Sequence, residues 1–323
     1  MVSNKVVVLG GTGFIGRAVV NALSKHGYEI SVVVRRPERF RDYLLFPKTK
    51  LVQMDSLLSS EALVRVFKHA GLIVNCLADL TLKTEAVEEN DYVAVHQQIK
   101  KAIETAQVKR VISVSQIGAN AGNATHSWLY HLGEADAIMH SIANAQTTIL
   151  RSGILLGAKD EVASCFKRQL NLMPVLPVAN ASKQVQPLAV QDFAKALVAS
   201  IQNRSLFWKK VEVVGEERMT MKALANRVKE MMEKEDAVVF SMCRLNARFM
   251  SFLGALAPIK SVSAVQMVLL EADLISDTDF STQFGFEPMS VEQALAAYVL
   301  TTHQRERYNA FRQAAGRNLE ELA

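Results

Sequence analysis

The chain has 323 residues, of which 50% are hydrophobic and 21% are charged, and its formal net charge is +5. This composition is typical of a globular protein and excludes a disordered or collagen-like chain. The positive charge is modest and forms no stripe with interleaved aromatic residues, so we expect no nucleic-acid partner.

The three cysteines, Cys76, Cys165 and Cys243, are far apart in the sequence. Their spacing predicts neither a zinc site nor a disulfide framework, and we expect no metal. No apolar run reaches the length of a membrane-spanning helix, and the first predicted strand begins about five residues after Met1. We therefore expect a cytoplasmic protein, with peripheral attachment to the inner membrane face as an alternative.

The first predicted strand leads directly into a glycine motif, because residues 6–16 read VVVLGGTGFIG. Gly10 allows a sharp turn, Gly13 lets a phosphate approach the backbone, and Gly16 allows the following helix to pack on the sheet. The pattern predicts a dinucleotide whose pyrophosphate lies at a helix N-terminus. A glycine-rich turn without a ligand is the alternative. The expected contacts are Gly10, Thr12, Gly13, Phe14, Ile15 and Gly16.

The second predicted strand, 29–34, ends in Arg35 and Arg36. An NAD-binding site usually carries a carboxylate at this point, which accepts hydrogen bonds from the ribose 2′-hydroxyl. Guanidinium groups instead suit a 2′-phosphate. The sequence therefore favours NADP(H) as the cofactor, while NAD(H) and a solvated basic loop stay open as alternatives.

Strands and helices alternate regularly as far as residue 150. This alternation predicts an α/β fold with a doubly wound parallel Rossmann sheet and helices on both faces. Asp55 follows the third strand, where it can accept from an adenine amino group, and Leu77 and Ala78 follow the fourth. The predicted strands are 6–9, 29–34, 51–54, 72–76, 110–114 and 147–150, and the helices are 14–26, 60–69 and 91–106.

The regular alternation ends after residue 150. We expect a loop-rich insertion at about 156–187, a helix over 190–203 and a strand over 211–215, which completes a cofactor domain of residues 1–215. Residues 216–323 are predicted to form a smaller, mostly helical C-terminal subdomain. The Met- and Leu-rich segment 242–262 has near-helical spacing of apolar residues, which suits a protein or membrane contact and equally suits packing within the subdomain.

The motif GGTGFIG resembles that of the extended and atypical short-chain dehydrogenase/reductases. Further similarities are a Ser-Val-Ser run ending at Ser115, the segment LRSGILLG at 150–157, and QPLAVQDFA at 186–194. The overall pattern looks most like the atypical branch that contains the nucleotide-binding accessory subunit of respiratory complex I and its bacterial relatives. The resemblance implies a dinucleotide cofactor and a Rossmann domain.

The sequence departs from this family at the catalytic pair. Active members use a Tyr and a Lys four residues later, so that one helix face presents both groups. Here Trp128 occupies the expected Tyr position and Leu132 the expected Lys position, while Tyr130 lies out of phase. Ser115 and Tyr130 are the weak catalytic candidates that remain, and His126 and His131 would serve only an unconventional site.

Two functions follow from this departure. The first is a non-catalytic assembly or accessory factor, linked to respiratory complex I or membrane quinone metabolism, that holds NADP(H). The second is an active NAD(P)-dependent oxidoreductase or epimerase-type enzyme with unconventional acid–base groups. A transcriptional redox sensor on the same fold is a third idea. The sequence leaves open whether the protein is an enzyme.

Overall fold

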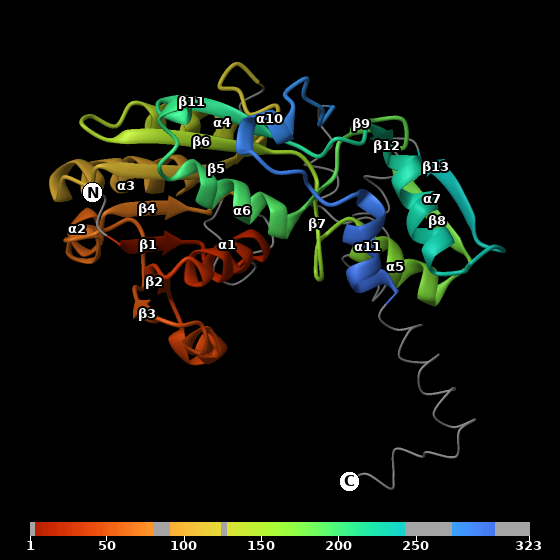
Figure 1. The fold of residues 1–323 in the computed structure, drawn as a ribbon, viewed down its shortest axis with the longest axis horizontal. Coiled ribbons are helices and arrows are strands. Elements are labelled where there is room, and N and C mark those ends of the chain that lie inside the picture. The colour runs from red at the N-terminus through yellow and green to blue at the C-terminus, as the bar shows by residue number, and fades with distance from the viewer. Residues whose placement is uncertain (1–3, 80–90, 124–127, 243–272, 301–323) are drawn as a thin grey trace, which may run out of the picture.

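The computed structural model describes residues 4–79, 91–123, 128–242 and 273–300 (Figure 1). Within these residues, seven strands form one parallel central sheet in the order β11-β6-β5-β4-β1-β2-β3. The chain order reverses between β1 and β4, so the predicted doubly wound α/β fold is confirmed. The strands are β1 (Lys5–Leu9), β2 (Glu29–Val34), β3 (Thr49–Gln53), β4 (Leu72–Asn75), β5 (Arg110–Gln116), β6 (Gln146–Ser152) and β11 (Lys209–Val213).

Helices cover both faces of this sheet (Figure 1). Val6 and Val8 of β1 join the hydrophobic cluster that contains α1 and α6, whereas Val7 and Leu9 join the cluster that contains α2, α3 and α4. This alternation follows from the two-residue period of a strand and explains why β1 is apolar from Val6 to Leu9. The helices are α1 (Phe14–Lys25), α2 (Ser60–Phe67), α3 (Tyr92–Ala106), α4 (Trp128–His140) and α6 (Val190–Ser200).

A further hydrophobic cluster lies beyond the sheet and draws on Ile117 and on residues between 154 and 299 (Figure 1). It includes side chains of α5 (Ala163–Leu172), β8 (Val175–Ala179), α7 (Met221–Met231), β13 (Val238–Met242) and α11 (Val291–Val299). Strand β8 pairs in parallel with β13. The insertion that we expected to be rich in loops therefore contains a helix and a paired strand. The predicted domain boundary at residue 215 stays a prediction.

The short elements complete the described chain. They are η1 (Pro37–Leu45), β7 (Leu155–Leu156), β9 (Gln184–Val185), β10 (Leu188–Ala189), η4 (Arg204–Leu206), β12 (Met219–Thr220) and α10 (Phe280–Phe284). The segment 242–262 lies outside the described residues except for Met242, and no helix in the described part of the chain is long and apolar enough to cross a bilayer.

Local sequence signals explain several helix ends. The side chain of Ser290 accepts a hydrogen bond from the Gln293 N–H, as expected at the start of α11. Gly27 has φ +78° just after α1, a left-handed conformation that favours glycine at a helix C-terminus. Gly27 therefore marks the end of α1, and Ser290 marks the start of α11.

Candidate functional site

The glycine motif forms a close crossing between β1 and α1. Gly10 has φ +67°, and a Cβ there would lie 2.7 Å from the carbonyl oxygen of Cys76. A Cβ at Gly16 would lie 2.2 Å from the carbonyl oxygen of Gly10. Both positions therefore require glycine, which brings the first turn of α1 against the loop and keeps its N-terminus at the carboxyl edge of the sheet.

Tyr43 of η1 forms a hydrogen bond to the backbone of the glycine loop. Its hydroxyl donates to the carbonyl oxygen of Gly11 at 2.7 Å, and burial raises the pKa of Tyr43 well above its usual value. The guanidinium of Arg17 lies 4.9 Å from the Tyr43 ring centroid and contacts Asp42 at 2.5 Å. This set of contacts ties η1 to the loop and to α1.

A cavity of about 770 Å³, here named the outer cavity, lies over the carboxyl ends of β1, β2 and β3. Both Arg35 and Asp55 line it, and both are exposed. The predicted contact residues on its wall are Gly10, Thr12, Arg35, Asp55 and Leu77.

A second cavity of about 570 Å³, here named the inner cavity, lies over the carboxyl ends of β4, β5 and β6. The N-terminal turn of α1 lies between the two cavities, because Thr12 lines the outer one and Phe14 and Ile15 line the inner one. The two cavities thus meet at the point where the strand order reverses. The predicted contact residues on the inner wall are Phe14, Ile15, Ala78 and Ser115.

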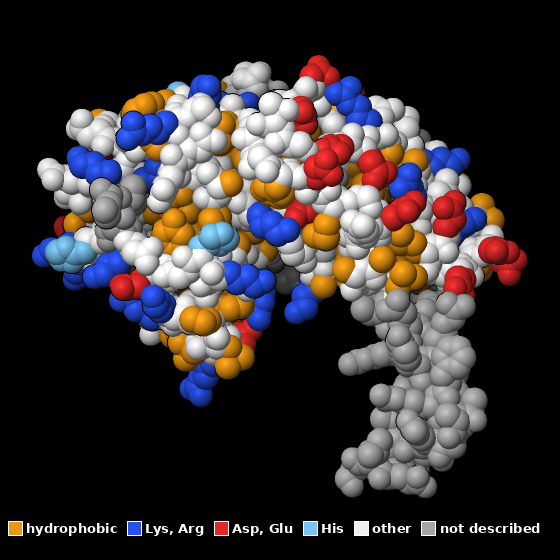
Figure 2. All heavy atoms as spheres, in the orientation of Figure 1, with side chains coloured by type: hydrophobic (Ala, Val, Ile, Leu, Met, Phe, Trp, Pro, Cys, Tyr) orange, Lys and Arg blue, Asp and Glu red, His pale blue; other side chains and the backbone are white. Residues whose placement is uncertain are grey.

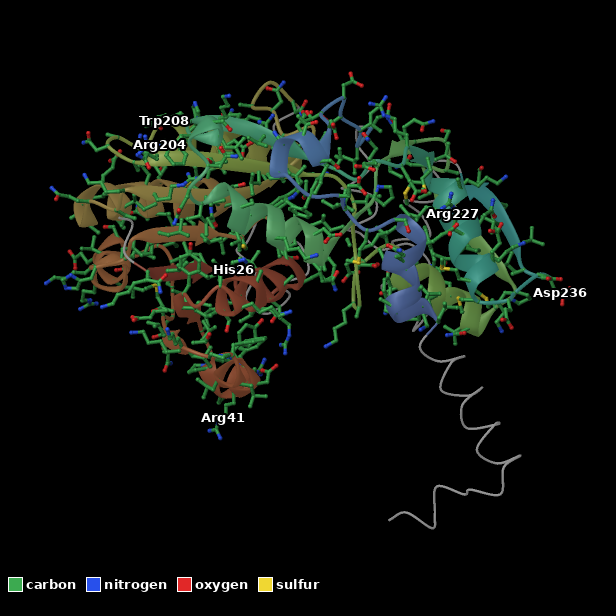
Figure 3. The ribbon with its side chains drawn as sticks, viewed as in Figure 1. His26, Arg41, Arg204, Trp208, Arg227 and Asp236 are labelled. Carbon is green, nitrogen blue, oxygen red and sulfur yellow. The ribbon has the colours of Figure 1, made fainter. Side chains whose placement is uncertain are left out.

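The other predicted residues lie outside these two cavities. Gly13 immediately precedes α1 and lines a separate groove beside Arg17, while Gly16 serves the helix crossing. Arg36 is exposed at the start of η1. Farther along η1, Arg41 projects from its tip away from the body of the molecule (Figure 3). Tyr130 is half-buried on α4 beside His131, with ring centroids 5.4 Å apart, and His126 lies outside the described residues.

The two positions expected for the catalytic pair face the hydrophobic core. Trp128 packs against Tyr92 with ring centroids 4.8 Å apart, and Leu132 is buried in the same cluster. Both side chains fill the contact between α3 and α4. In the described part of the chain, no tyrosine or lysine lines the inner cavity.

An ion pair lies behind the inner cavity. The Nε and Nη2 atoms of Arg151 on β6 donate to Asp136 Oδ2 at 2.9 and 2.8 Å. Burial raises the pKa of Asp136, and the charge of Arg151 and the Ser115 hydroxyl oppose this rise. Ser115 is the register partner of Arg151 between β5 and β6. Sequence reasoning selected Ser115 but missed Asp136 and Arg151.

Sequence reasoning also missed a polar network under the end of β4. Asn75 Nδ2 donates to His96 Nε2 at 2.9 Å and to Ser113 Oγ at 3.1 Å, while Asn75 Oδ1 accepts from the Leu77 N–H at 3.1 Å. His96 Nδ1 donates to the Tyr92 carbonyl oxygen at 2.7 Å. Burial lowers the pKa of His96 to about 4, so the ring is neutral and fits this arrangement of donors and acceptors.

The inner cavity is also lined by carboxylates, of which Asp79 and Asp160 accept hydrogen bonds from the backbone. Asp79 Oδ2 accepts from the Ile15 N–H at 2.7 Å. Asp160 accepts from the backbone N–H groups of Gly157, Val162 and Ser164, and from the Tyr298 hydroxyl at 2.5 Å. The only signal in the sequence was the position of Asp79 just after the predicted fourth strand. The contact with Tyr298 links α11 to the cavity wall.

The charge distribution around the outer cavity suits an anion. Figure 2 shows Lys and Arg side chains gathered around the β1–β3 side of the molecule, and many of the Asp and Glu side chains on the α7 side. The field of such a surface attracts a negatively charged ligand. No cluster of potential metal ligands occurs among the described residues.

Residues 10–168 match the protein-family model described as NAD(P)H-binding. The chain is thus similar to that family over just under half of its length. The match includes the glycine motif and, apart from Leu9, the residues that line the two cavities, and it agrees with the predicted dinucleotide-binding Rossmann fold.

The relatives agree with the predicted branch. The chain is 25% identical over 220 residues to the mitochondrial NADH dehydrogenase [ubiquinone] 1 alpha subcomplex subunit 9 of Dictyostelium discoideum, covering 66% of this chain and 60% of that protein. It is 28% identical over 197 residues to ceramide reductase of Caulobacter vibrioides, covering 60% of each. The chain thus matches less than two thirds of the length of these curated relatives.

Among solved structures, the NADPH complex of an NADPH-dependent quinone oxidoreductase from Escherichia coli is similar, with a TM-score of 0.70 and 16% identity. The superposition covers 90% of this chain and 99% of that structure. This likeness concerns the fold. The relatives named as complex I subunits bear out the predicted resemblance to the accessory branch, and the similar structure bears out the fold.

Proposed function

We propose that the protein binds NADP(H) across the outer and inner cavities and acts without the usual catalytic pair, as an accessory or assembly factor linked to respiratory complex I or membrane quinone metabolism. The observation that carries the proposal is the wall of the outer cavity, where Arg35 stands at the carboxyl end of β2 in place of the usual carboxylate.

The outer cavity supports the choice of NADP(H). Arg35 offers a planar fork of donors that matches a 2′-phosphate, and Arg36 is exposed next to it. Asp55 on the same wall can accept from the adenine amino group. The pyrophosphate would then lie at the N-terminus of α1, and the nicotinamide would enter the inner cavity beside Ala78 and Ser115.

The inner cavity supports the non-catalytic role. In the family that this chain resembles, proton exchange with a carbonyl substrate uses a Tyr and a Lys within hydrogen-bond reach. The described lining residues include neither a tyrosine nor a lysine, and Trp128 and Leu132 are buried in the core. Ser115 contributes a hydroxyl, which can contact the cofactor and has no neighbouring lysine on that wall.

The relatives support the biological setting. One of them is named as a subunit of mitochondrial NADH dehydrogenase, and a similar structure is named as a quinone oxidoreductase. We extend both names to this chain as part of the proposal, together with a protein or membrane contact through residues 242–262 and a location in the cytoplasm or at the inner membrane face.

An active oxidoreductase is the second candidate. The buried Asp136 carboxylate has a raised pKa and interacts with the hydroxyl of Ser115, which lines the inner cavity, and this acid–base arrangement does not need the usual pair. The relative named ceramide reductase also favours this candidate.

One experiment separates the two candidates. The purified protein is titrated with NADPH, and NADPH oxidation is then followed with a panel of quinones, ketones and aldehydes. Tight binding with no substrate-dependent oxidation is the expected result. Oxidation that Ser115→Ala or Asp136→Asn abolishes, while both variants still bind NADPH, would instead establish the enzyme.

A further inference from the structure

Asp79 lies at the N-terminus of α1, which is the helix end that we expect to bind the pyrophosphate of a dinucleotide. Its side chain is only 4% exposed, and its Oδ2 atom accepts from the backbone N–H of Ile15 at 2.7 Å. Ile15 is the second residue of α1, a helix of 12 residues, so this N–H belongs to the turn that has no intrahelical acceptor. The carboxylate thus holds a position that would otherwise be open to an anionic ligand.

The contact is favourable in the empty protein. The N-terminus of a helix carries a partial positive charge, and a carboxylate that accepts a backbone hydrogen bond there is stabilised. The charge of Asp79 is also felt nearby, since it adds to the effect of burial in raising the pKa values of Cys76 and Tyr43. Both residues contact or flank the glycine loop.

We propose that Asp79 occupies the anion position of α1 in the empty protein and determines the affinity for the dinucleotide, whose pyrophosphate must displace it. This inference rests on the proposed NADP(H) function. Two negative groups compete for one helix end, so binding requires the Asp79 carboxylate to leave the Ile15 N–H or to remain beside the pyrophosphate at an electrostatic cost. Either way the site binds NADP(H) more weakly than the same site with a neutral residue at position 79.

Asp79 should weaken the binding of the pyrophosphate and leave the binding of the 2′-phosphate almost unchanged. In the proposed complex, the adenosine 2′-phosphate end would lie in the outer cavity, which Arg35 lines, whereas the pyrophosphate would lie at the start of α1. A fragment that has the 2′-phosphate but lacks the pyrophosphate does not need the helix end. Adenosine 2′-monophosphate is such a fragment.

The test compares the wild type with Asp79→Asn by calorimetric titration with NADPH and with adenosine 2′-monophosphate. The amide oxygen of asparagine can still accept from the Ile15 N–H, so the helix end keeps a partner. Asp79→Ser serves as a second neutral variant, and Glu230→Gln removes the same charge from an exposed position on α7. We expect Asp79→Asn to bind NADPH at least about tenfold more tightly, with affinity for the fragment changed less than about twofold.

The outcomes are distinct. If both neutral variants bind NADPH no more tightly than the wild type, Asp79 does not compete with the pyrophosphate and the inference fails, while the proposed function stands. An equal gain for the fragment, or the same gain in Glu230→Gln, would show a general charge effect and would also overturn it. If neither the wild type nor any variant binds NADPH or NADH, the proposed function itself fails.

Discussion

The two ends of strand β5 use charge in different ways. At its first residue, Arg110 is fully buried and its guanidinium makes hydrogen bonds to Ser200 O, Ile201 O, Gln146 O, Val111 O and Thr148 Oγ1. Its carbon Cζ also lies 4.5 Å from the centroid of the Phe207 ring. At the other end of β5, Ser115 and Gln116 line the inner cavity, with Asp79 and Asp160 on the same wall.

The charge of Arg110 therefore serves the structure, whereas a ligand can reach the charges at the inner cavity. The acceptors of Arg110 include carbonyl oxygens at the C-terminus of α6, where the helix dipole favours a cation. Burial lowers the pKa of Arg110 to about 10, so it stays charged near neutral pH. The carboxylates of Asp79 and Asp160 accept hydrogen bonds from the backbone N–H groups of Ile15 and Val162, which line the same cavity. Mutations at the two ends should therefore affect different properties.

The largest effect is expected at Arg110. Arg110→Met removes all five hydrogen bonds and leaves buried carbonyl groups without a donor, which should lower the free energy of unfolding by about 4 kcal/mol. Urea denaturation measures this loss. Arg204→Met, at an exposed position on the nearby η4 (Figure 3), is the control and should change stability by less than about 0.5 kcal/mol. Similar losses in both variants would refute the structural role of Arg110.

The next effect concerns His96, below the carboxyl end of β4. Its pKa is about 4 in the folded protein and about 6.5 when unfolded, so the unfolded state takes up the proton first as the pH falls. Stability from this group is complete above pH 6.5 and is lost between pH 6.5 and 4, by on the order of 3 kcal/mol.

His96→Gln should remove that part of the pH dependence. The difference in unfolding free energy between about pH 7 and pH 4 should therefore be smaller in His96→Gln than in the wild type. The control is His140→Gln, at the exposed end of α4, which should keep the wild-type slope. An unchanged slope in His96→Gln would mean that His96 does not titrate in this way.

A smaller effect is expected at Tyr298, which connects α11 to the inner cavity. Tyr298→Phe removes the hydrogen bond to Asp160 and should cost about 2 kcal/mol of unfolding free energy, because the acceptor is a buried carboxylate. Chemical denaturation of Tyr298→Phe beside Tyr28→Phe, which removes a hydroxyl at the amino edge of the sheet, checks this. Equal stability of the two variants would show that the hydrogen bond from Tyr298 to Asp160 does not stabilise the contact between α11 and the cavity wall.

The local parts of the structure were predictable from the sequence because they depend on neighbouring residues. The alternation of Val6 to Leu9 between two cores, the turn at Gly27 and the cap at Ser290 follow from strand period, backbone conformation and hydrogen bonding within a few residues. The arrangement of Arg35 and Asp55 on one cavity follows from the parallel order of β2 and β3.

The parts that could not be predicted depend on distant residues. Asp79 meets Ile15 across 64 positions, and Tyr298 meets Asp160 across 138. Pro177 lies in the insertion that we expected to be rich in loops, yet its strand β8 pairs with β13 some 60 residues later. Such contacts arise when separate elements pack together, and neither residue type nor spacing specifies them in a single sequence.

In the proposed complex, Arg35 makes the outer cavity prefer a ligand with a 2′-phosphate. Parallel titrations with NADPH and NADH test this preference most directly. The wild type should bind NADPH at least about tenfold more tightly than NADH, and Arg35→Ala should lose most of that preference while still binding NADH. An Arg35→Ala variant that keeps the wild-type preference, or a wild type that prefers NADH, would contradict the account.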